Sequence, residues 1–147
     1  YVAGMPTIIA YLTGQSGPLT VIGAHPSSPR SSEDFARRNR ELEALPELAV
    51  YQRGPRVLLG DLNTTSWSPF FQDFLEETGL VDSRFGFGVE PTWPALPLPL
   101  RIPIDHCLVS REVAVTARRV GPAIGSDHRG VVIDLEIPGS DRNRAAP

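Results

Sequence analysis

The sequence contains no lysine, so each of the 14 basic side chains other than histidine is an arginine. The 17 acidic residues outnumber them and give a net charge of -3. Non-specific binding to a nucleic-acid backbone depends on clustered cationic side chains. The composition therefore argues weakly against a protein that binds long duplex DNA by charge. Genomic base composition explains the exclusive use of arginine better than phosphate binding does.

Cysteine and long apolar runs are also scarce. Cys107 is the single cysteine, which excludes an internal disulfide and a cysteine-based zinc cluster. No apolar run approaches the ~18–20 residues that span a bilayer, and no signal peptide is visible. Because the sequence starts with Tyr1 rather than methionine, we expect it to be cut from a longer protein whose targeting segment is out of view.

The residues that are present suit one globular domain. With 147 residues, of which 41% are hydrophobic and 21% charged, the chain is long enough to bury a core. We expect residues 1–138 to form a single domain and the polar residues 139–147 to form a flexible tail.

Strands and helices follow in the order β-β-α-β-α-β-β-β, which predicts a mixed, layered α/β fold of the α+β-like kind. Residues 14–18 separate the first two strands and predict a hairpin. Residues 85–103 contain five prolines and favour a long loop, either ordered and shaping substrate entry or mobile. The strands are expected at 7–12, 19–25, from 56, at 104–110, 113–120 and 130–137, with a short edge segment at 80–83.

Capping residues and apolar stripes predict two helices. Ser31 or Ser32 caps the first, which begins with two acids, and Pro46 ends or kinks it. Ser68 offers a capping hydroxyl before a proline at the first position of the second helix, and Gly79 is its expected stop. The buried stripes contain Phe35, Leu42, Leu45 and Ala49 in the first helix and Phe70, Phe71, Phe74 and Leu75 in the second.

Two small polar side chains follow the apolar run 57–59. Asp61 and Asn63 point the same way if the strand continues past Gly60, because side chains alternate along a strand. Polar groups at the end of a buried strand are typical of sites in α/β folds. Taken alone, these residues are more often a turn capped by the aspartate side chain.

Other acids and imidazoles occur at the ends of predicted strands. Each of these residues, taken alone, is explained by an ordinary structural role in a turn or strand. The joint occurrence of His25, Asp105, Asp127 and His128 with Asp61 nevertheless indicates a functional site.

Four motifs carry a family resemblance, and they are Gly23-Ala24-His25-Pro26, Gly60-Asp61-Leu62-Asn63, Ile104-Asp105-His106 and Gly125-Ser126-Asp127-His128. Over about residues 7–137 the chain resembles the endonuclease/exonuclease/phosphatase superfamily with the DNase I-like fold. The segments Ser68-Pro69, with Phe71, and Thr92-Trp93 look like those of a bacterial branch whose members are often membrane-anchored.

The resemblance implies a two-sheet sandwich flanked by helices and a divalent-metal-dependent phosphoester hydrolase. His128 would be the general base or a phosphate ligand, and Asp105 would orient its imidazole. Asp61 would position or protonate a reacting oxygen, and whether it or His128 is the base stays open.

The remaining implied roles concern charge on the phosphoryl group. His25 and Asn63 would donate to the non-bridging oxygens as negative charge builds. Asp127 and Asp61 would be metal ligands for Mg²⁺ or Mn²⁺, which prefer oxygen donors.

One departure from the family pattern concerns its N-terminal half. The early asparagine and the glutamate that is the family's principal metal ligand have no counterpart here. We therefore expect a C-terminal portion of the domain, incomplete at its N-terminus, with an open sheet edge that could pair edge-to-edge in a dimer. By resemblance, a membrane anchor would lie outside this chain and the domain outside the cytoplasm.

Two functions fit these features. The first is hydrolysis of a phosphate ester that is lipid-linked, a small molecule or nucleic acid, with the branch resemblance favouring the first two. The second is a non-catalytic binding module of the same fold, to which the missing glutamate points. A serine hydrolase is disfavoured because the sequence has no Gly-x-Ser-x-Gly motif.

Overall fold

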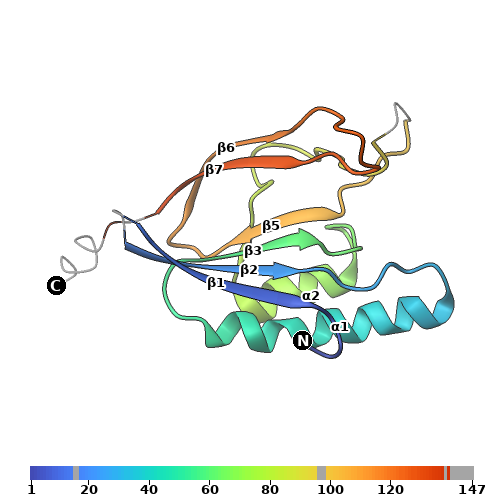
Figure 1. Cartoon of the computed structure of the whole chain (residues 1–147), viewed down its shortest axis with the longest axis horizontal. Helices are drawn as coiled ribbons and strands as arrows, with labels where there is room; N and C mark the ends of the chain where they lie inside the picture. The colour runs from blue at the N-terminus through green and yellow to red at the C-terminus, as the bar shows by residue number, and fades with distance from the viewer. Residues whose placement is uncertain (15–16, 96–98, 138, 140–147) are drawn as a thin grey trace.

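The computed structural model describes residues 1–14, 17–95, 99–137 and 139, and it arranges them in layers (Figure 1). Two helices cover one face of a five-stranded sheet with the order β1-β2-β3-β5-β4, and the β6-β7 pair lies over the other face. The predicted two-sheet α/β architecture is confirmed. The elements are β1 (Thr7–Gly14), β2 (Gly17–Ala24), α1 (Ser32–Tyr51), β3 (Arg56–Asp61), α2 (Pro69–Thr78), β4 (Val81–Asp82), β5 (Asp105–Val109), β6 (Ala114–Val120) and β7 (Val131–Glu136).

Helix α1 begins where the sequence predicts and runs further than expected. The Ser31 hydroxyl accepts a hydrogen bond from the Asp34 N–H at 3.1 Å and caps the helix. The sequence predicts that Pro46 ends or kinks the helix, and the first alternative is wrong because the helix continues to Tyr51. Pro46 is buried on the side of the helix that faces the core, and this burial offsets a cost of ~3 kcal/mol for proline in a helix interior.

The N-terminal half of α1 buries an arginine, whereas the sequence predicts a buried phenylalanine there. Phe35 is 47% exposed, so its predicted place in the core is wrong, whereas Arg38 is only 4% exposed. The Arg38 guanidinium lies 4.7 Å from the centroid of the Phe35 ring and donates to the Asn63 carbonyl oxygen at 3.1 Å. Burial lowers the pKa of Arg38 below its ordinary value. The ring therefore stacks on the cation and stays at the surface.

Helix α2 starts and stops at the predicted residues. Pro69 opens it, and Gly79 closes it in the left-handed conformation with φ 66°, donating its N–H to the Leu75 carbonyl at 2.9 Å. The capping role predicted for the Ser68 hydroxyl is wrong, because this side chain makes no capping hydrogen bond among the described residues.

Strand pairing brings three strand ends to one edge of the large sheet, at the right of Figure 1. β2 runs parallel to β3, and β5 runs antiparallel to β3, so the ends of β2 and β3 meet the start of β5. Gly60 permits this arrangement, because a Cβ atom there would lie 1.9 Å from the Ala24 carbonyl oxygen. The backbones of β2 and β3 can therefore approach closely just before Asp61.

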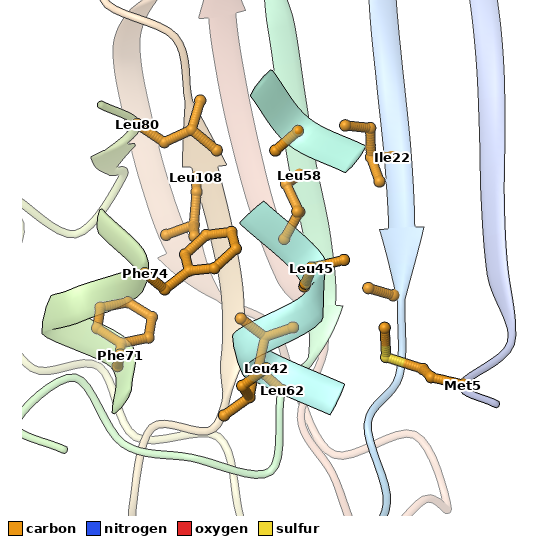
Figure 2. Packing of buried hydrophobic residues seen from close by; sticks show 12 residues of the cluster. Met5, Ile22, Leu42, Leu45, Leu58, Leu62, Phe71, Phe74, Leu80 and Leu108 are labelled. Atoms are coloured by element: carbon orange, nitrogen blue, oxygen red, sulfur yellow. The ribbon is translucent and has the colours of Figure 1, made fainter. Parts of the chain in front are cut away.

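Apolar side chains line both interfaces between the layers. The interface between the large sheet and the helices is centred on Leu45, Leu58 and Leu108, all fully buried (Figure 2). A second cluster includes Val57 and Cys107 and packs against residues of β6 and β7. Burial raises the pKa of the Cys107 thiol to about 11, which leaves it protonated and unreactive.

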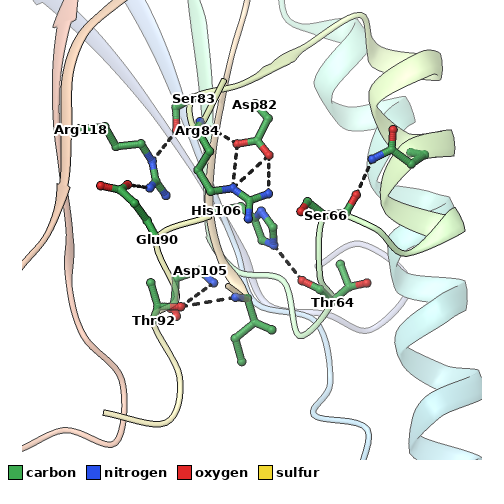
Figure 3. A network of polar contacts seen from close by, with 12 residues as sticks. Thr64, Ser66, Asp82, Ser83, Arg84, Glu90, Thr92, Asp105, His106 and Arg118 are labelled. Atoms are coloured by element: carbon green, nitrogen blue, oxygen red, sulfur yellow. Dashed lines mark hydrogen bonds and ion pairs between the residues drawn. The ribbon is translucent and has the colours of Figure 1, made fainter. Parts of the chain in front are cut away.

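A buried polar network lies beside the start of β5 (Figure 3). His106 points away from Asp105, and its Nε2–H donates to the Thr64 carbonyl at 2.8 Å while the ring packs 4.4 Å from that of Phe71. Burial lowers the pKa of His106 to about 4, with the Arg84 charge acting in the same direction. The imidazole is therefore neutral at physiological pH.

A second buried contact ties the small sheet to the loop after β4. Arg118 on β6 forms an ion pair with Glu90, and its Nε donates to the Ser83 hydroxyl at 3.2 Å (Figure 3). The Arg118 side chain is fully buried. This pair fixes residues 83–90 against the β6-β7 layer.

Three sequence expectations concern residues outside the described ranges. They are residues 15–16 of the predicted hairpin turn, residues 96–98 of the proline-rich loop and residues 140–147 of the predicted tail. Around the turn, β1 and β2 pair antiparallel up to Gly14 and Gly17. Within the described residues, the helices are too short or too polar to cross a membrane.

Candidate active site

Acids and imidazoles from separate segments meet at the sheet edge formed by β2, β3 and β5. Asp61 ends β3 and is the register partner of Asp105, which begins β5. His25 follows the last residue of β2, and Asp127 and His128 lie in the loop between β6 and β7. The structure thus brings together residues that are more than 100 positions apart in the sequence.

A hydrogen-bonded imidazole–carboxylate pair lies at the centre. His128 Nδ1 donates to Asp105 Oδ2 at 2.9 Å, which leaves Nε2 3.7 Å from Asp61 Oδ2. Partial burial lowers the pKa of His128, but the hydrogen bond and charge of Asp105, with the charges of Asp61 and Asp127, outweigh it. The net result is a pKa above the ordinary value for histidine.

Asp61 is a shielded carboxylate whose side chain is 14% exposed. Burial raises its pKa above the ordinary value, and the charge of Asp105 acts in the same direction. The Asn63 N–H and the two imidazoles oppose this shift without cancelling it. Asp61 therefore holds a proton more readily than an ordinary surface aspartate.

The segment from Asp61 to Asn63 forms the side-chain-capped turn, and β3 ends at Asp61. Asn63 N–H donates to Asp61 Oδ1 at 2.8 Å, and Asn63 has a left-handed φ of 49°, as in a side-chain-capped turn. This turn, rather than a continued strand, places Asn63 beside the site. Its Nδ2 donates to the Pro26 carbonyl at 2.9 Å, which leaves the second amide hydrogen for another acceptor.

His25 lies at the open side of the site, with its side chain 66% exposed. Its Nδ1 donates to the Asp61 backbone carbonyl at 3.1 Å. Nε2 then carries a hydrogen only in the protonated imidazole, so His25 can donate to an anion only as a cation.

These side chains line a cavity of about 510 Å³, which lies within the usual range of ~300–1,000 Å³ for small-molecule sites. Its polar lining consists of His25, Ser28, Arg30, Asp61, Asn63, Asp127 and His128. A second cavity of about 460 Å³ between the two sheets is mostly apolar and is also lined by Asp61, Asp105 and His128. The site therefore opens on two sides.

Asp61, Asp105 and His128 are the group that could hold a metal ion among the described residues. Each offers one ligand atom, and these atoms lie within 4.8 Å of one another. Two carboxylates fit a hard divalent cation, although three ligands supply only part of its usual six. Asp127 lies outside this group and accepts a hydrogen bond from Trp93 Nε1 at 3.4 Å, so its predicted role as a ligand stays a prediction.

Thr92 is a contributor that the sequence did not single out for a role at the site. Its hydroxyl accepts hydrogen bonds at 3.4 Å from the backbone N–H groups of Ile104 and Asp105. Figure 3 draws the contact between Thr92 and Asp105 as a dashed line, and the Thr92 carbonyl accepts the Arg129 N–H at 2.9 Å. Thr92 therefore connects the segments that carry Asp105 and His128. The Thr-Trp pair between prolines was the only sequence signal.

Comparison with known proteins gives a consistent result. The sequence profile described as Endonuclease/Exonuclease/phosphatase family matches residues 2–128. Comparison with curated proteins found no match.

Solved structures share the fold at low sequence identity. An endonuclease/exonuclease/phosphatase from Beutenbergia cavernae is 24% identical with a TM-score of 0.75, over 92% of this chain and 40% of that one. The human Nocturnin catalytic domain with bound sulfate is 19% identical with a TM-score of 0.66, over 90% and 53% of the two chains. A mannosyl-6-phosphatase from Bacteroides thetaiotaomicron is 19% identical with a TM-score of 0.57, over 82% and 51%.

The chain thus spans about half the length of these solved structures, and their likeness shows the fold. The profile match extends over most of the chain and includes the segments that carry His25, Asp61, Asp105 and His128. The chain therefore belongs to the endonuclease/exonuclease/phosphatase family.

Proposed function

We propose that the protein is a divalent-metal-dependent phosphoester hydrolase. The observation that carries the proposal is the Asp105–His128 pair facing Asp61 across 3.7 Å in a cavity large enough for a small ester. Family membership supports hydrolysis of phosphoric esters as the general chemistry.

Hydrolysis of a phosphoester needs an activated water and neutralisation of the charge on the phosphoryl oxygens. Asp61 and His128 could each accept the proton of the water, and both have raised pKa values. Burial raises the pKa of Asp61. Burial lowers the pKa of His128, but its acidic neighbours raise it by more. We assign the base to Asp61, because the carboxylates around His128 favour its protonated form. A protonated His128 then donates from Nε2 to a phosphoryl oxygen, and Asp105 fixes its orientation.

The open side of the cavity supplies two more donors. Protonated His25 would donate from Nε2, and Asn63 would donate its second amide hydrogen, both to non-bridging oxygens. Removing one donor of this kind typically costs about 10²–10³ in kcat.

Asp61 and Asp127, the two ligands that the family resemblance implies, would hold the Mg²⁺ or Mn²⁺ ion at the cavity that both line. Such an ion acts as a Lewis acid that neutralises charge on the phosphoryl oxygens.

The proposed substrate is a lipid-linked or small phosphate ester rather than long duplex DNA. The net charge of -3 disfavours non-specific attraction to a polyanion. The likeness to a mannosyl-6-phosphatase is compatible with a small substrate. The resemblance to the membrane-anchored branch is compatible with a lipid-linked substrate.

The test is a panel of phosphodiesters and phosphomonoesters with the full-length protein, in Mg²⁺, in Mn²⁺ and in EDTA. The panel should contain a lipid pyrophosphate, a sugar phosphate, a nucleotide and duplex DNA. We expect metal-dependent release of phosphate or alcohol from at least one small or lipid-linked member. Binding of an ester without turnover would instead favour a non-catalytic module, and inertness toward every member would refute the proposal.

A further inference from the structure

The cavity that holds the polar site continues into a part that the proposed chemistry does not use. Pro29 and Arg30, from the loop between β2 and α1, line it together with Trp93, Ile102 and Ile104. This part is apolar apart from Ser28 and one exposed guanidinium. A phosphoryl group bound by His25, Asn63 and His128 would leave it for the rest of the substrate.

Arg30 is available to bind an anion. In the described ranges its guanidinium makes no hydrogen bond or ion pair, whereas Arg37 on the next helix is held by Ser27 and Asp34. Guanidinium groups bind phosphate and carboxylate in a bidentate manner. The Arg30 guanidinium therefore offers a binding position for a second anionic group of a substrate whose phosphoryl group lies at the candidate metal site.

Trp93 is held in place at the same cavity. Its N–H donates to the Ile102 carbonyl at 3.1 Å, the Ile102 N–H donates to its carbonyl at 2.7 Å, and the indole Nε1 donates to Asp127 at 3.4 Å. The backbone of Asp127 is bonded in turn to Ala95, at 2.7 Å. The loop segment that carries Trp93 is therefore fixed to the loop that carries His128.

The indole lies close to the reaction centre. Its ring centroid is 6.4 Å from that of His128, and Trp93 is 37% exposed. An aromatic face that is fixed and partly open is a stacking platform for a flat ring. A ring joined by a short linker to a phosphoryl group at His128 would reach it.

We infer that Trp93 and Arg30 form a specificity subsite that selects phosphoesters carrying a flat ring and a second anionic group, as a nucleoside bisphosphate does. The inference rests on the proposed hydrolase function and names its substrate class. Trp93 supplies the stacking face, and Arg30 binds the second anion. The preference is then set at the β2–α1 loop and residue 93 rather than at the residues that act on the phosphoryl group.

Four probes separate the two parts of the subsite. They are adenosine 3′,5′-bisphosphate (ring and second anion), AMP (ring only), glycerol 1,3-bisphosphate (second anion only) and glycerol 1-phosphate (neither). The full-length protein is assayed for kcat/KM on each in Mn²⁺. We expect the order to follow the number of matched features, with adenosine 3′,5′-bisphosphate first.

Arg30→Gln should lower kcat/KM about tenfold on the two bisphosphates and leave the two monophosphates unchanged, because a charge-assisted contact is lost. Arg53→Gln is the matched control at an exposed arginine of the α1–β3 turn and should change none of the four. An equal effect of Arg30→Gln on all four probes, or none, would overturn the role of Arg30.

Trp93 variants separate the stacking face from the indole hydrogen bond. Trp93→Leu should lower kcat/KM about tenfold on the two adenosine probes, whereas Trp93→Phe keeps a ring and should retain most of it. If both variants lose equally on all probes, the bond to Asp127 matters rather than stacking. Tighter binding of geranyl diphosphate than of adenosine 3′,5′-bisphosphate would assign the apolar surface to an alkyl chain and also overturn the inference.

Calorimetric binding of adenosine 3′,5′-bisphosphate distinguishes failure of the subsite from failure of the hydrolase function. Tight binding that Arg30→Gln weakens, without turnover of any probe, would refute the hydrolase and keep the subsite. Turnover of the probes with no preference among them would refute the subsite and keep the hydrolase.

Discussion

Acidification should destabilise the protein through one buried imidazole, that of His106. The ring is 3% exposed, its Nε2–H is bonded to the Thr64 carbonyl, and its Nδ1 has no hydrogen-bond partner among the described residues. Protonation would add a buried charge and an unpaired N–H next to Arg84. For this reason the pKa of His106 falls from 6.5 to about 4.

The sign and the size of the effect follow from proton linkage. The unfolded chain binds a proton near pH 6.5 and the folded chain only near pH 4, so the free energy of unfolding falls as the pH is lowered between these values. A pKa difference of roughly 2.5 at 1.36 kcal/mol each amounts to about 3 kcal/mol over the whole window. Between pH 7.5 and pH 5 the expected loss is about 2 kcal/mol.

The assay is urea unfolding at pH 7.5 and pH 5 for the wild type and His106→Gln. Glutamine keeps an N–H donor for the Thr64 carbonyl but does not titrate. The titration of His128 and of surface carboxylates is common to both proteins and cancels in the difference. The variant should lose about 2 kcal/mol less than the wild type on acidification. Equal losses in the two proteins would refute the argument.

Three further perturbations test other parts of the structure. Gly60→Ala should lower the free energy of unfolding by about 3 kcal/mol or prevent folding, because the new methyl group would clash with the Ala24 backbone. Gly14→Ala is the control and should lower it far less, because no atom of the described residues beyond its chain neighbours lies within 4 Å of the added methyl group. Arg118→Ala should cost about 3–5 kcal/mol by leaving Glu90 unpaired, and adding Glu90→Gln should restore part of it. Asp105→Asn should lower kcat about 10²–10⁴-fold with little change in melting temperature.

Each of these predictions has an outcome that contradicts it. Equal melting temperatures for Gly60→Ala and Gly14→Ala would mean that the close approach of β2 and β3 is not a constraint. Additive losses in the Arg118–Glu90 double variant would mean that the pair does not interact. If Asp105→Asn leaves kcat and its pH dependence unchanged, the imidazole–carboxylate pair has no role in the reaction.

The parts of the fold that local sequence predicts well are those set by nearest neighbours. The proline and glycine at the ends of α2 and the serine cap of α1 depend on a few adjacent residues, and they lie where expected. The acidic residues that the sequence predicts at the ends of strands also lie together at one edge of the sheet. Asp61 and Asp105 do so because β3 and β5 pair in a register that aligns them.

Features that depend on distant partners could not be read from the sequence. Pro46 lies inside a continuing helix at a buried position beside α2, and Phe35 stays outside because Arg38 takes the buried position. The bond between Arg118 and Glu90 joins residues 28 positions apart. The hydroxyl of Thr92 reaches the Asp105 N–H across a loop, and the Thr-Trp pair in the sequence does not predict this contact.

The rate of phosphoester hydrolysis by full-length wild type and His128→Gln, side by side in Mn²⁺ and in EDTA, tests the central claim most directly. Asp73→Asn, at an exposed position of α2, is the control. We predict metal-dependent turnover of at least one small ester, lost in EDTA, reduced about 1,000-fold in His128→Gln and unchanged in the control. Turnover by His128→Gln within a few-fold of the wild type, or no turnover by the wild type on any ester, would contradict it.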